Sequence, residues 1–368
     1  MFPEPVPSMT NPWERHARIT RIGLCGLLVV ARVGAAQAPA DAKTAARKDS
    51  ASVPKIFSSE TPLAVTLTTN IKQLRGDRSE MSPYRSATIT YAGSDGKPVS
   101  VPLKVKTHGI WRLKHCEFPP LRLNFSNKTT KKTVFHDLDR PKFVNACRNN
   151  DAYEQLVLQE FQLYRIYQVL TPASHRARLL RVTYADSASG KDDATRYAFI
   201  FEDPDQLADR LNGKMIKTKG ATPDDIDAAQ GAIAYLFEYL IGNTDFSFNG
   251  LHNGELVMRL DGTNLVPIAY DFDFSGAVNA PYATVDPKLP VKKVRQRLFR
   301  GYCAFKDEYP AAIALFQAKK DAIYALYHDD IGKLMDQGVV RETLEYFDEF
   351  YKDLKNPRDA LSTCVGSR

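Results

Sequence analysis

Two short acidic segments in the second half of the chain have the residue types of a phosphoryl-transfer site. Gly242-Asn-Thr-Asp245 places a carboxylate at the expected end of a helix, and Asp271-Phe-Asp273 follows Asp245 by 26 residues. Asn253 lies between them, with Asn249 as an alternative. Phosphoryl transfer needs an Asp near the acceptor hydroxyl, and a carboxylate with a nearby Asn to hold Mg²⁺. The order of these residues therefore favours transfer of a phosphoryl group from a nucleotide.

A third carboxylate, Glu160, interrupts the apolar face of a helix predicted over residues 152–170. It lies four residues after Leu156 on that face. A carboxylate in such a position is costly unless a cation or a hydrogen-bond donor meets it. Arg165 and Arg178 are the structural partners that the sequence offers, and a phosphate-binding cation is the functional alternative.

Period-two hydrophobic patterns and turn residues predict a strand-rich, antiparallel first half. A second helix is expected to begin with the capping sequence Thr222-Pro-Asp-Asp225 and to stop at Gly242. A hairpin between the two acidic segments and a helical last third, from about Pro310, complete the pattern. The predicted strands span residues 63–68, 87–91, 99–106, 121–125, 179–184, 197–201, 255–260 and 265–270.

Six short segments have the order of motifs found in a known family. They are Lys106-Thr-His-Gly-Ile-Trp111, Phe118-Pro-Pro-Leu-Arg-Leu123, Ser174-His-Arg-Ala-Arg178, Phe199-Ile-Phe-Glu202, Gly242-Asn-Thr-Asp245 and Tyr270-Asp-Phe-Asp273. This ordered set resembles the atypical kinases of the spore-coat CotH family, with a weaker similarity to HipA-type kinases. It covers residues 62–300, and the set is more specific than any one segment.

The resemblance implies an α+β, two-lobed protein-kinase-like fold with an antiparallel, strand-rich N-lobe and a mainly helical C-lobe. Residues 62–205 and 206–356 would form the two lobes, after a linker over 39–61 and before a tail over 357–368. The implied function is transfer of the γ-phosphate of ATP, with Mg²⁺ or Mn²⁺, to a Ser, Thr or Tyr hydroxyl of a protein substrate.

The same resemblance implies a role for each matching residue. Asp245 would orient or deprotonate the acceptor. The metal would be held by Asp271 as the principal ligand, Asp273 close by, and Asn253 at the second position. The nucleotide-binding residues would be Gly109 over the phosphates, Arg122 or Lys142 as the cation that pairs with Glu160, and Glu202 at the edge of the adenine pocket.

The chain departs from the family where the phosphates would bind. His108-Gly-Ile110 stands in place of the usual Arg-Gly-Asn, which removes one basic and one polar side chain. The Asn after Asp245 also comes later than in HipA-type kinases. A catalytically inactive nucleotide- or protein-binding module is therefore the alternative function. A metal-dependent hydrolase, for which the sequence offers no clear nucleophile, is the third.

Both acidic segments also have a purely structural interpretation. Asp271-Phe-Asp273 is compatible with a solvated turn after a strand, and Asp245 with a loop residue at a helix end. Neither segment is specific alone. The prediction of a site depends on their combination with Asn253.

Composition excludes several classes of protein. Of 368 residues, 43% are hydrophobic and 10% are aromatic, which is too apolar for a disordered chain. No apolar run reaches the roughly 20 residues that span a bilayer, so no transmembrane segment is expected in the mature chain. The net charge of +7 is spread along the sequence. No compact basic and aromatic platform is present, so nucleic-acid binding is not expected.

Residues 1–38 have the pattern of a secretory signal peptide. Three arginines precede the apolar stretch Ile22–Ala31, and small residues follow it. Arg32 interrupts the apolar stretch, and a buried N-terminal helix is the alternative. The expected location is secreted or periplasmic. Because ATP is scarce outside the cytoplasm, either phosphate transfer takes place before or during export, or the signal peptide is not a true one.

The mature chain would keep four cysteines, an even number that suits an oxidising compartment. Cys116 and Cys147 are expected to form a disulfide that closes a loop of about thirty residues. The sequence leaves the pairing of Cys303 and Cys364 open. The spacing of the four fits no zinc site, and buried free thiols are the alternative in a cytosolic protein.

Overall fold

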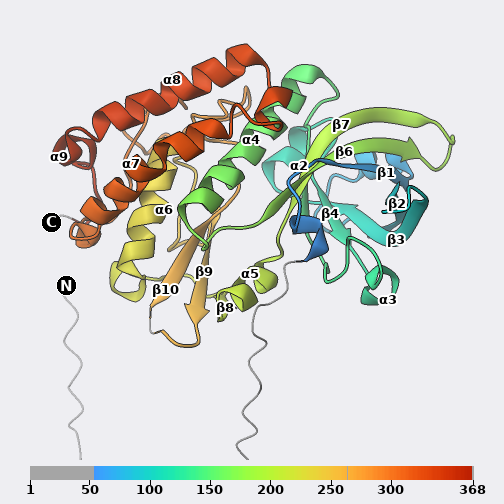
Figure 1. Cartoon of the computed structure of the whole chain (residues 1–368), viewed down its shortest axis with the longest axis horizontal. Coiled ribbons are helices and arrows are strands. Elements are labelled where there is room, and N and C mark those ends of the chain that lie inside the picture. The colour runs from blue at the N-terminus through green and yellow to red at the C-terminus, as the bar shows by residue number, and fades with distance from the viewer. Residues whose placement is uncertain (1–53, 263, 367–368) are drawn as a thin grey trace, which may run out of the picture. The chain divides into compact units, whose positions relative to one another are not determined.

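The computed structural model describes residues 54–262 and 264–366. Seven strands of its first half form a closed barrel in the order β1-β2-β3-β4-β5-β7-β6 (Figure 1). The strands are β1 (Leu63–Thr69), β2 (Arg85–Ala92), β3 (Pro98–Thr107), β4 (Leu121–Asn124), β5 (Lys142–Asn145), β6 (Ala177–Asp186) and β7 (Asp192–Phe201). The short elements around them are η1 (Lys55–Phe57), α1 (Ile71–Gly76), α2 (Trp111–His115) and α3 (Asn127–Thr130).

Strand β1 closes the barrel because it is paired along both edges. It runs antiparallel to β2, with Leu67 opposite Ile89, and parallel to β6, with Val65 opposite Val182. These apolar side chains are buried inside the barrel, while their neighbours along each strand point outward. A closed barrel leaves no edge strand free to pair with another chain.

The expected two-lobed kinase-like fold, with an antiparallel N-lobe and a mainly helical C-lobe, is wrong. The first sheet is mixed and closed because β1 and β6 are parallel. The second half contains a three-stranded sheet in the order β10-β9-β8 beside its helices. Hydrophobic periodicity indicates which face of a strand is buried, but it does not indicate which strand lies next to it. The sequence therefore did not reveal the closure.

Helix α4 (Asp151–Leu170) lies between the barrel and the helices of the second half (Figure 1). It packs on β7 on one side and on α6 and α7 on the other. Its N-cap residue Asn150 accepts a hydrogen bond from the N–H of Tyr153. The middle of the helix is buried all round, and this is why Glu160 is buried with it.

The second half continues with α5 (Pro204–Arg210), β8 (Gly213–Ile216), η2 (Pro223–Asp225), α6 (Ala228–Ile241), β9 (Gly254–Arg259), β10 (Leu265–Ala269), η3 (Cys303–Phe305), α7 (Tyr309–Ala325), η4 (Gly332–Leu334), α8 (Gln337–Asp353) and α9 (Pro357–Ala360). The predicted capping box is present, with Thr222 N and Oγ1 both donating to Asp225 Oδ2. It caps the turn η2, however. Helix α6 begins later, at a second cap in which Asp227 accepts from Gln230 N–H.

Two disulfides tie segments of the chain together. Cys116 is joined to Cys147, as the sequence predicts, with their Cα atoms 4.7 Å apart. Cys303 is joined to Cys364, so the segment expected as a tail is attached to η3. The predicted signal peptide lies outside the described residues. In the part of the chain that the structure describes, no helix has the length and apolar content needed to span a membrane.

Candidate functional site

Three basic residues lie in a row across neighbouring strands of the barrel. Lys106 on β3 is opposite Arg122 on β4, and Arg122 is opposite Lys142 on β5. Like charges placed side by side on a sheet repel each other. Arg122 and Lys142 form no ion pair with any described residue, and the Lys142 ammonium instead lies 3.7 Å from the ring centre of Tyr270. These three residues are called the cationic row, and Arg122 and Lys142 are its members available to bind an anion.

Arg122 and Lys142 line a cavity of about 470 Å³. The rest of its wall comes from the residue Arg140 before β5, the segment after β7, strand β8 with the residues that follow it, and the loop and hairpin after α6. Its other lining residues are Arg140, Asp203, Pro204, Asp205, Met215, Ile216, Lys217, Lys219, Leu251, Gly254, Glu255 and Tyr270. The cavity has the size of a small-molecule site, and it combines apolar side chains with charged ones.

Glu160, Asp271 and Asp273 form a carboxylate cluster next to this cavity. Glu160 and Asp273 are only 2% and 4% exposed. Burial, followed by repulsion from Asp273 and Asp271, raises the pKa of Glu160 well above its usual value. Burial and Asp271 raise the pKa of Asp273 to about 7. Glu160 Oε1 is buried without a hydrogen-bond partner among the described residues. Burial and mutual repulsion thus favour the protonated forms of Glu160 and Asp273 unless a cation binds beside them.

The cation that acts on Glu160 and Asp273 is Arg112 on α2, whereas Lys142 acts on Asp271. Arg112 Nη1 lies 3.8 Å from Asp273 Oδ2. Burial alone would lower the pKa of Arg112, but Tyr282, Asp273 and Glu160 hold it above its usual value. The expected pairing of Glu160 with Arg122 or Lys142 is thus corrected. No periodic pattern singled out Arg112, because its helix has only five residues.

Asp271 combines an unusual backbone conformation with a free carboxylate. Its φ of 66° is left-handed, and its N–H donates to Tyr164 Oη at 3.0 Å. Its carboxylate makes no hydrogen bond or ion pair with the described residues. Non-glycine residues in this conformation are uncommon and concentrate at functional sites. The carboxylate is available to a ligand.

Asp245 lies in the loop that follows α6. Gly242 ends the helix with a φ of 64°, and a Cβ atom there would clash with Tyr346 Oη, so only glycine fits. The Asp245 side chain is half-exposed, and its Oδ1 lies 2.9 Å from His252 Nε2. The negative charge of Asp245 also raises the pKa of Asp273, but less than burial and the charge of Asp271 do. Asp245 therefore lies at the open side of the carboxylate cluster.

Asn253, and not Asn249, is the amide beside Asp245. Asn253 Nδ2 donates to the backbone oxygen of Asp245 at 2.7 Å and to Oδ2 at 3.1 Å. Asn253 O also accepts from the N–H of Tyr270, which joins this loop to the chain just before Asp271. The Asn249 amide donates to Ala221 O at 2.8 Å. Of the two candidate amides, Asn253 is thus the one that contacts Asp245.

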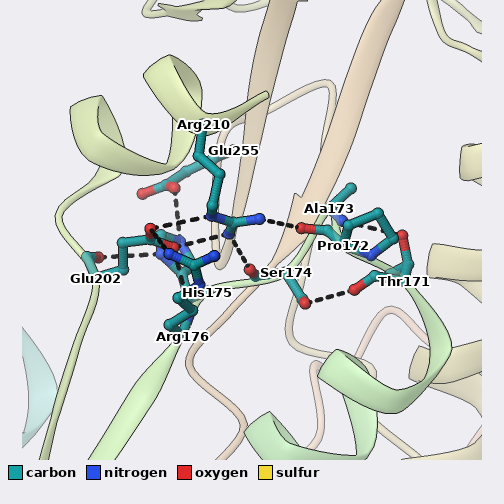
Figure 2. A network of polar contacts seen from close by, with 9 residues as sticks. All are labelled: Thr171, Pro172, Ala173, Ser174, His175, Arg176, Glu202, Arg210 and Glu255. Carbon is teal, nitrogen blue, oxygen red and sulfur yellow. Dashed lines mark hydrogen bonds and ion pairs between the residues drawn. The ribbon is translucent and has the colours of Figure 1, made fainter. Parts of the chain in front are cut away.

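Glu202 does not line the cavity. Figure 2 shows it in a network in which Arg210 donates to both of its oxygens, at 2.8 and 3.1 Å. The next residues, Asp203 to Asp205, form part of the cavity wall instead. In the same network His175 Nε2 contacts Glu255 Oε2 at 3.0 Å, and Glu255 faces the cavity. The network thus fixes the position of Glu255 in the cavity wall.

Gly109 lies in the turn between β3 and α2, with a φ of 106°, and it does not line the cavity. Its neighbour His108 lies closer to the cationic row. Burial, followed by repulsion from Arg122 and Lys142, lowers the pKa of His108 to about 3. His108 is therefore neutral at pH 7 and adds no positive charge to the site.

The carboxylate cluster does not form a complete metal site. Over residues 54–262 and 264–366, no group of three or more His, Cys, Asp or Glu side chains is arranged to hold a metal ion. Mg²⁺ is commonly bound by one or two carboxylates together with phosphate oxygens of the substrate. The free Asp271 carboxylate and the unpartnered Glu160 Oε1 fit a divalent ion only if a bound phosphate completes its ligands.

Comparison with known proteins assigns this chain to no family. No family model and no curated protein matches it. The function must therefore be inferred from the chemistry of the cavity and the carboxylate cluster.

Proposed function

We propose that this chain transfers the γ-phosphate of ATP to a Ser, Thr or Tyr hydroxyl of a protein substrate. The main support is that unpaired cations lie next to carboxyl groups that lack a matching cation. Arg122 and Lys142 line the cavity, and in the carboxylate cluster burial and mutual repulsion raise the pKa of Glu160 and Asp273, so a bound divalent ion would favour their charged forms. Tyr270 lines the cavity and Asp271 directly follows it. ATP with a bound divalent ion has the complementary pattern of charge.

The cavity residues divide between the two ends of a nucleotide. Arg122 and Lys142 would bind phosphate oxygens through charge-assisted hydrogen bonds. The apolar side chains of Met215, Ile216 and Leu251 would cover the base. This division supports a nucleotide over a smaller anion such as free phosphate, which would leave the apolar wall unused.

Asp271 would hold Mg²⁺ or Mn²⁺, with Asp273 close by and Asn253 at the second position. Asn253 uses its Nδ2 on Asp245, and its Oδ1 makes no hydrogen bond with the described residues. A bound divalent ion neutralises the negative charge of the transferring phosphoryl group. It would also offset the repulsion between Glu160, Asp271 and Asp273.

Asp245 would bind and orient the hydroxyl group of the protein substrate that accepts the phosphate. Its carboxylate is accessible, and hydrogen bonds to Asn253 and His252 fix its orientation. A positioned carboxylate can accept the proton of an attacking hydroxyl, which contributes about 10²–10⁴-fold to a rate. The motif resemblance to CotH-type kinases supports the same assignment. The two disulfides support an oxidising compartment, and a secreted or periplasmic location is part of this proposal.

The test is transfer of radiolabelled γ-phosphate from ATP by the full chain, with Mg²⁺ or Mn²⁺, to itself and to a generic protein acceptor. Label that is present in the wild type and absent in Asp271→Ala and Asp245→Ala supports the proposal. A binding module is the second candidate, because the turn at Gly109 adds no donor to the cavity. Its signature is a metal-dependent rise in melting temperature with ATP but no label. If ATP gives neither label transfer nor a rise in melting temperature, the chain has no nucleotide site.

A further inference from the structure

Helix α2 brings Arg112 to the carboxylate cluster, yet it is too short to fix its own position. It has five residues, and no side chain caps its N-terminus. The turn before it contains Gly109 at a positive φ and Ile110, which is 75% exposed. A single helical turn is unstable by itself. Contacts outside the helix must therefore hold Arg112 in place.

The Cys116–Cys147 disulfide fixes the C-terminal end of this helix. Cys116 is the C-cap residue, and its N–H donates to Arg112 O at 2.9 Å. Cys147 follows the end of β5 by two residues, and β5 begins with Lys142. Both cysteines are buried. The disulfide thus links the helix of Arg112 to the strand of a cavity cation.

Arg112 is attached to the same strand by a second contact. Its guanidinium donates to the backbone oxygen of Asn145, the last residue of β5. From there its Nη1 reaches Asp273 Oδ2. The adjacent Trp111 stacks on Tyr282, whose hydroxyl donates to Asp273 Oδ2 at 3.1 Å. Helix α2 is therefore a bridge between a barrel strand and the carboxylate cluster.

The helix also has an anchor that does not depend on the disulfide. The guanidinium of Arg78 donates to Leu113 O and Glu117 O, each at 3.2 Å, and to Cys116 O. Loss of the disulfide is thus expected to loosen the link between α2 and β5 without unfolding the barrel.

We propose that the Cys116–Cys147 disulfide is a positioning element of the phosphotransfer site, because it holds Arg112 against Asp273. This inference rests on the proposed function. Arg122 and Lys142 lie on strands and do not depend on α2, so ATP binding should not require the disulfide. The transfer step should require it. Activity would then be confined to compartments that maintain disulfides.

The second disulfide provides a matched control. In Cys116→Ala/Cys147→Ala we expect kcat for label transfer to fall by about tenfold, with KM for ATP changed by less than about twofold. In Cys303→Ala/Cys364→Ala we expect a lower melting temperature with kcat unchanged. An unchanged kcat in the first variant, or an equal fall in both, would overturn the inference.

A double-mutant cycle tests the link to Arg112. Arg112→Gln alone should lower kcat about as much as loss of the first disulfide, and combining the two changes should cause no further loss. Two losses that multiply would contradict the inference.

A second route avoids the risk that the alanine variant does not fold. In folded Cys303→Ala/Cys364→Ala, dithiothreitol can reduce the remaining disulfide by giving two electrons and two protons, while it closes to its cyclic disulfide. Complete reduction should give the same tenfold loss of kcat, and reoxidation should restore it. Full activity after complete reduction contradicts the inference.

Trp111 offers a readout that does not need activity. The chain has two tryptophans, so a Trp13→Phe background leaves only Trp111 fluorescent. Acrylamide quenching of Trp111 should increase on loss of the first disulfide and not of the second. If this difference is found in a protein that transfers no phosphate, the proposed function fails but the positioning of α2 stands. Equal quenching in both variants overturns the positioning inference.

Discussion

The side-chain amide of Asn253 holds Asp245 at two points, its backbone oxygen at 2.7 Å and its carboxylate Oδ2 at 3.1 Å. Asn253 has a left-handed backbone with a φ of 48°, a conformation that Asn tolerates better than most residues. The Asn253 backbone oxygen accepts from Tyr270 N–H, one residue before Asp271. Asn253 therefore links Asp245, the carboxylate proposed to accept the proton of the attacking hydroxyl, to Asp271, the proposed metal ligand.

Asn253→Ala is expected to lower the rate of label transfer by about 100-fold, because Asp245 loses its orientation and the metal loses a candidate ligand. Asn249→Ala is the matched control, since the Asn249 amide donates to Ala221 O and not to Asp245. That variant should change the rate by less than about twofold. Equal losses in the two variants would assign Asn253 a purely structural role.

Asp273→Asn is expected to stabilise the protein at alkaline pH in the absence of nucleotide and metal. The pKa of Asp273 is raised to about 7, so the folded state binds its proton more tightly than the unfolded state does. Its contribution is thus fully present below about pH 4 and is lost as the pH rises through about 7. Asparagine cannot ionise, so this loss disappears. At pH 8 the melting temperature should rise by roughly 4–8 °C.

Thermal unfolding at pH 5 and pH 8 checks this prediction. At pH 5 Asp273 is protonated in the wild type, so the variant should melt within about 2 °C of it. Asp224→Asn, at an exposed position of η2, controls for the loss of a carboxylate and should show no such pH dependence. A variant that is less stable than the wild type at pH 8 contradicts the repulsion inferred for the carboxylate cluster.

His108→Gln is expected to make the fold less sensitive to acid. The pKa of His108 is lowered to about 3, so between about pH 6.5 and pH 3 the unfolded state binds more protons and stability falls as the pH falls. Arg122, Lys142, Arg112 and Lys106 face His108 and oppose its protonation. Removing His108 should reduce the slope of unfolding free energy against pH by up to about 1.4 kcal/mol per unit.

Urea unfolding at pH 7, 6 and 5 measures that slope. His328→Gln, at an exposed position, is the control for removal of a histidine side chain. If His108→Gln and the wild type have the same slope, the cationic row does not oppose protonation of His108.

Much of the secondary structure could be predicted from the sequence, because period-two and helical patterns report burial directly. The hairpin formed by β9 and β10 places Asp271 beside the Asp245 loop, as the spacing suggested. Strand β5 was missed because its four residues, Lys142–Asn145, are too few for a clear alternation. The parallel pairing of β1 with β6 was missed because residues far apart in sequence make it.

The candidate site was predictable where a charge broke an apolar pattern, and less so elsewhere. Glu160 stood out on a buried helix face, and the structure brings it to Asp271 and Asp273. Arg112 was overlooked because only the tertiary fold brings α2 to Asp273. Glu202 was assigned to the nucleotide by the motif resemblance alone, and its partner Arg210 lies on a helix whose packing the sequence did not reveal.

The claim that the cationic row and the carboxylate cluster form one nucleotide site is tested most directly by calorimetric titration of ATP, with and without Mg²⁺. The wild type should bind ATP more tightly with Mg²⁺. Arg122→Gln/Lys142→Gln should bind at least about 100-fold more weakly, because two charge-assisted hydrogen bonds are lost. Lys72→Gln/Lys97→Gln, which removes two exposed charges, should bind like the wild type. No binding by the wild type, or equal affinity in both double variants, would contradict the account.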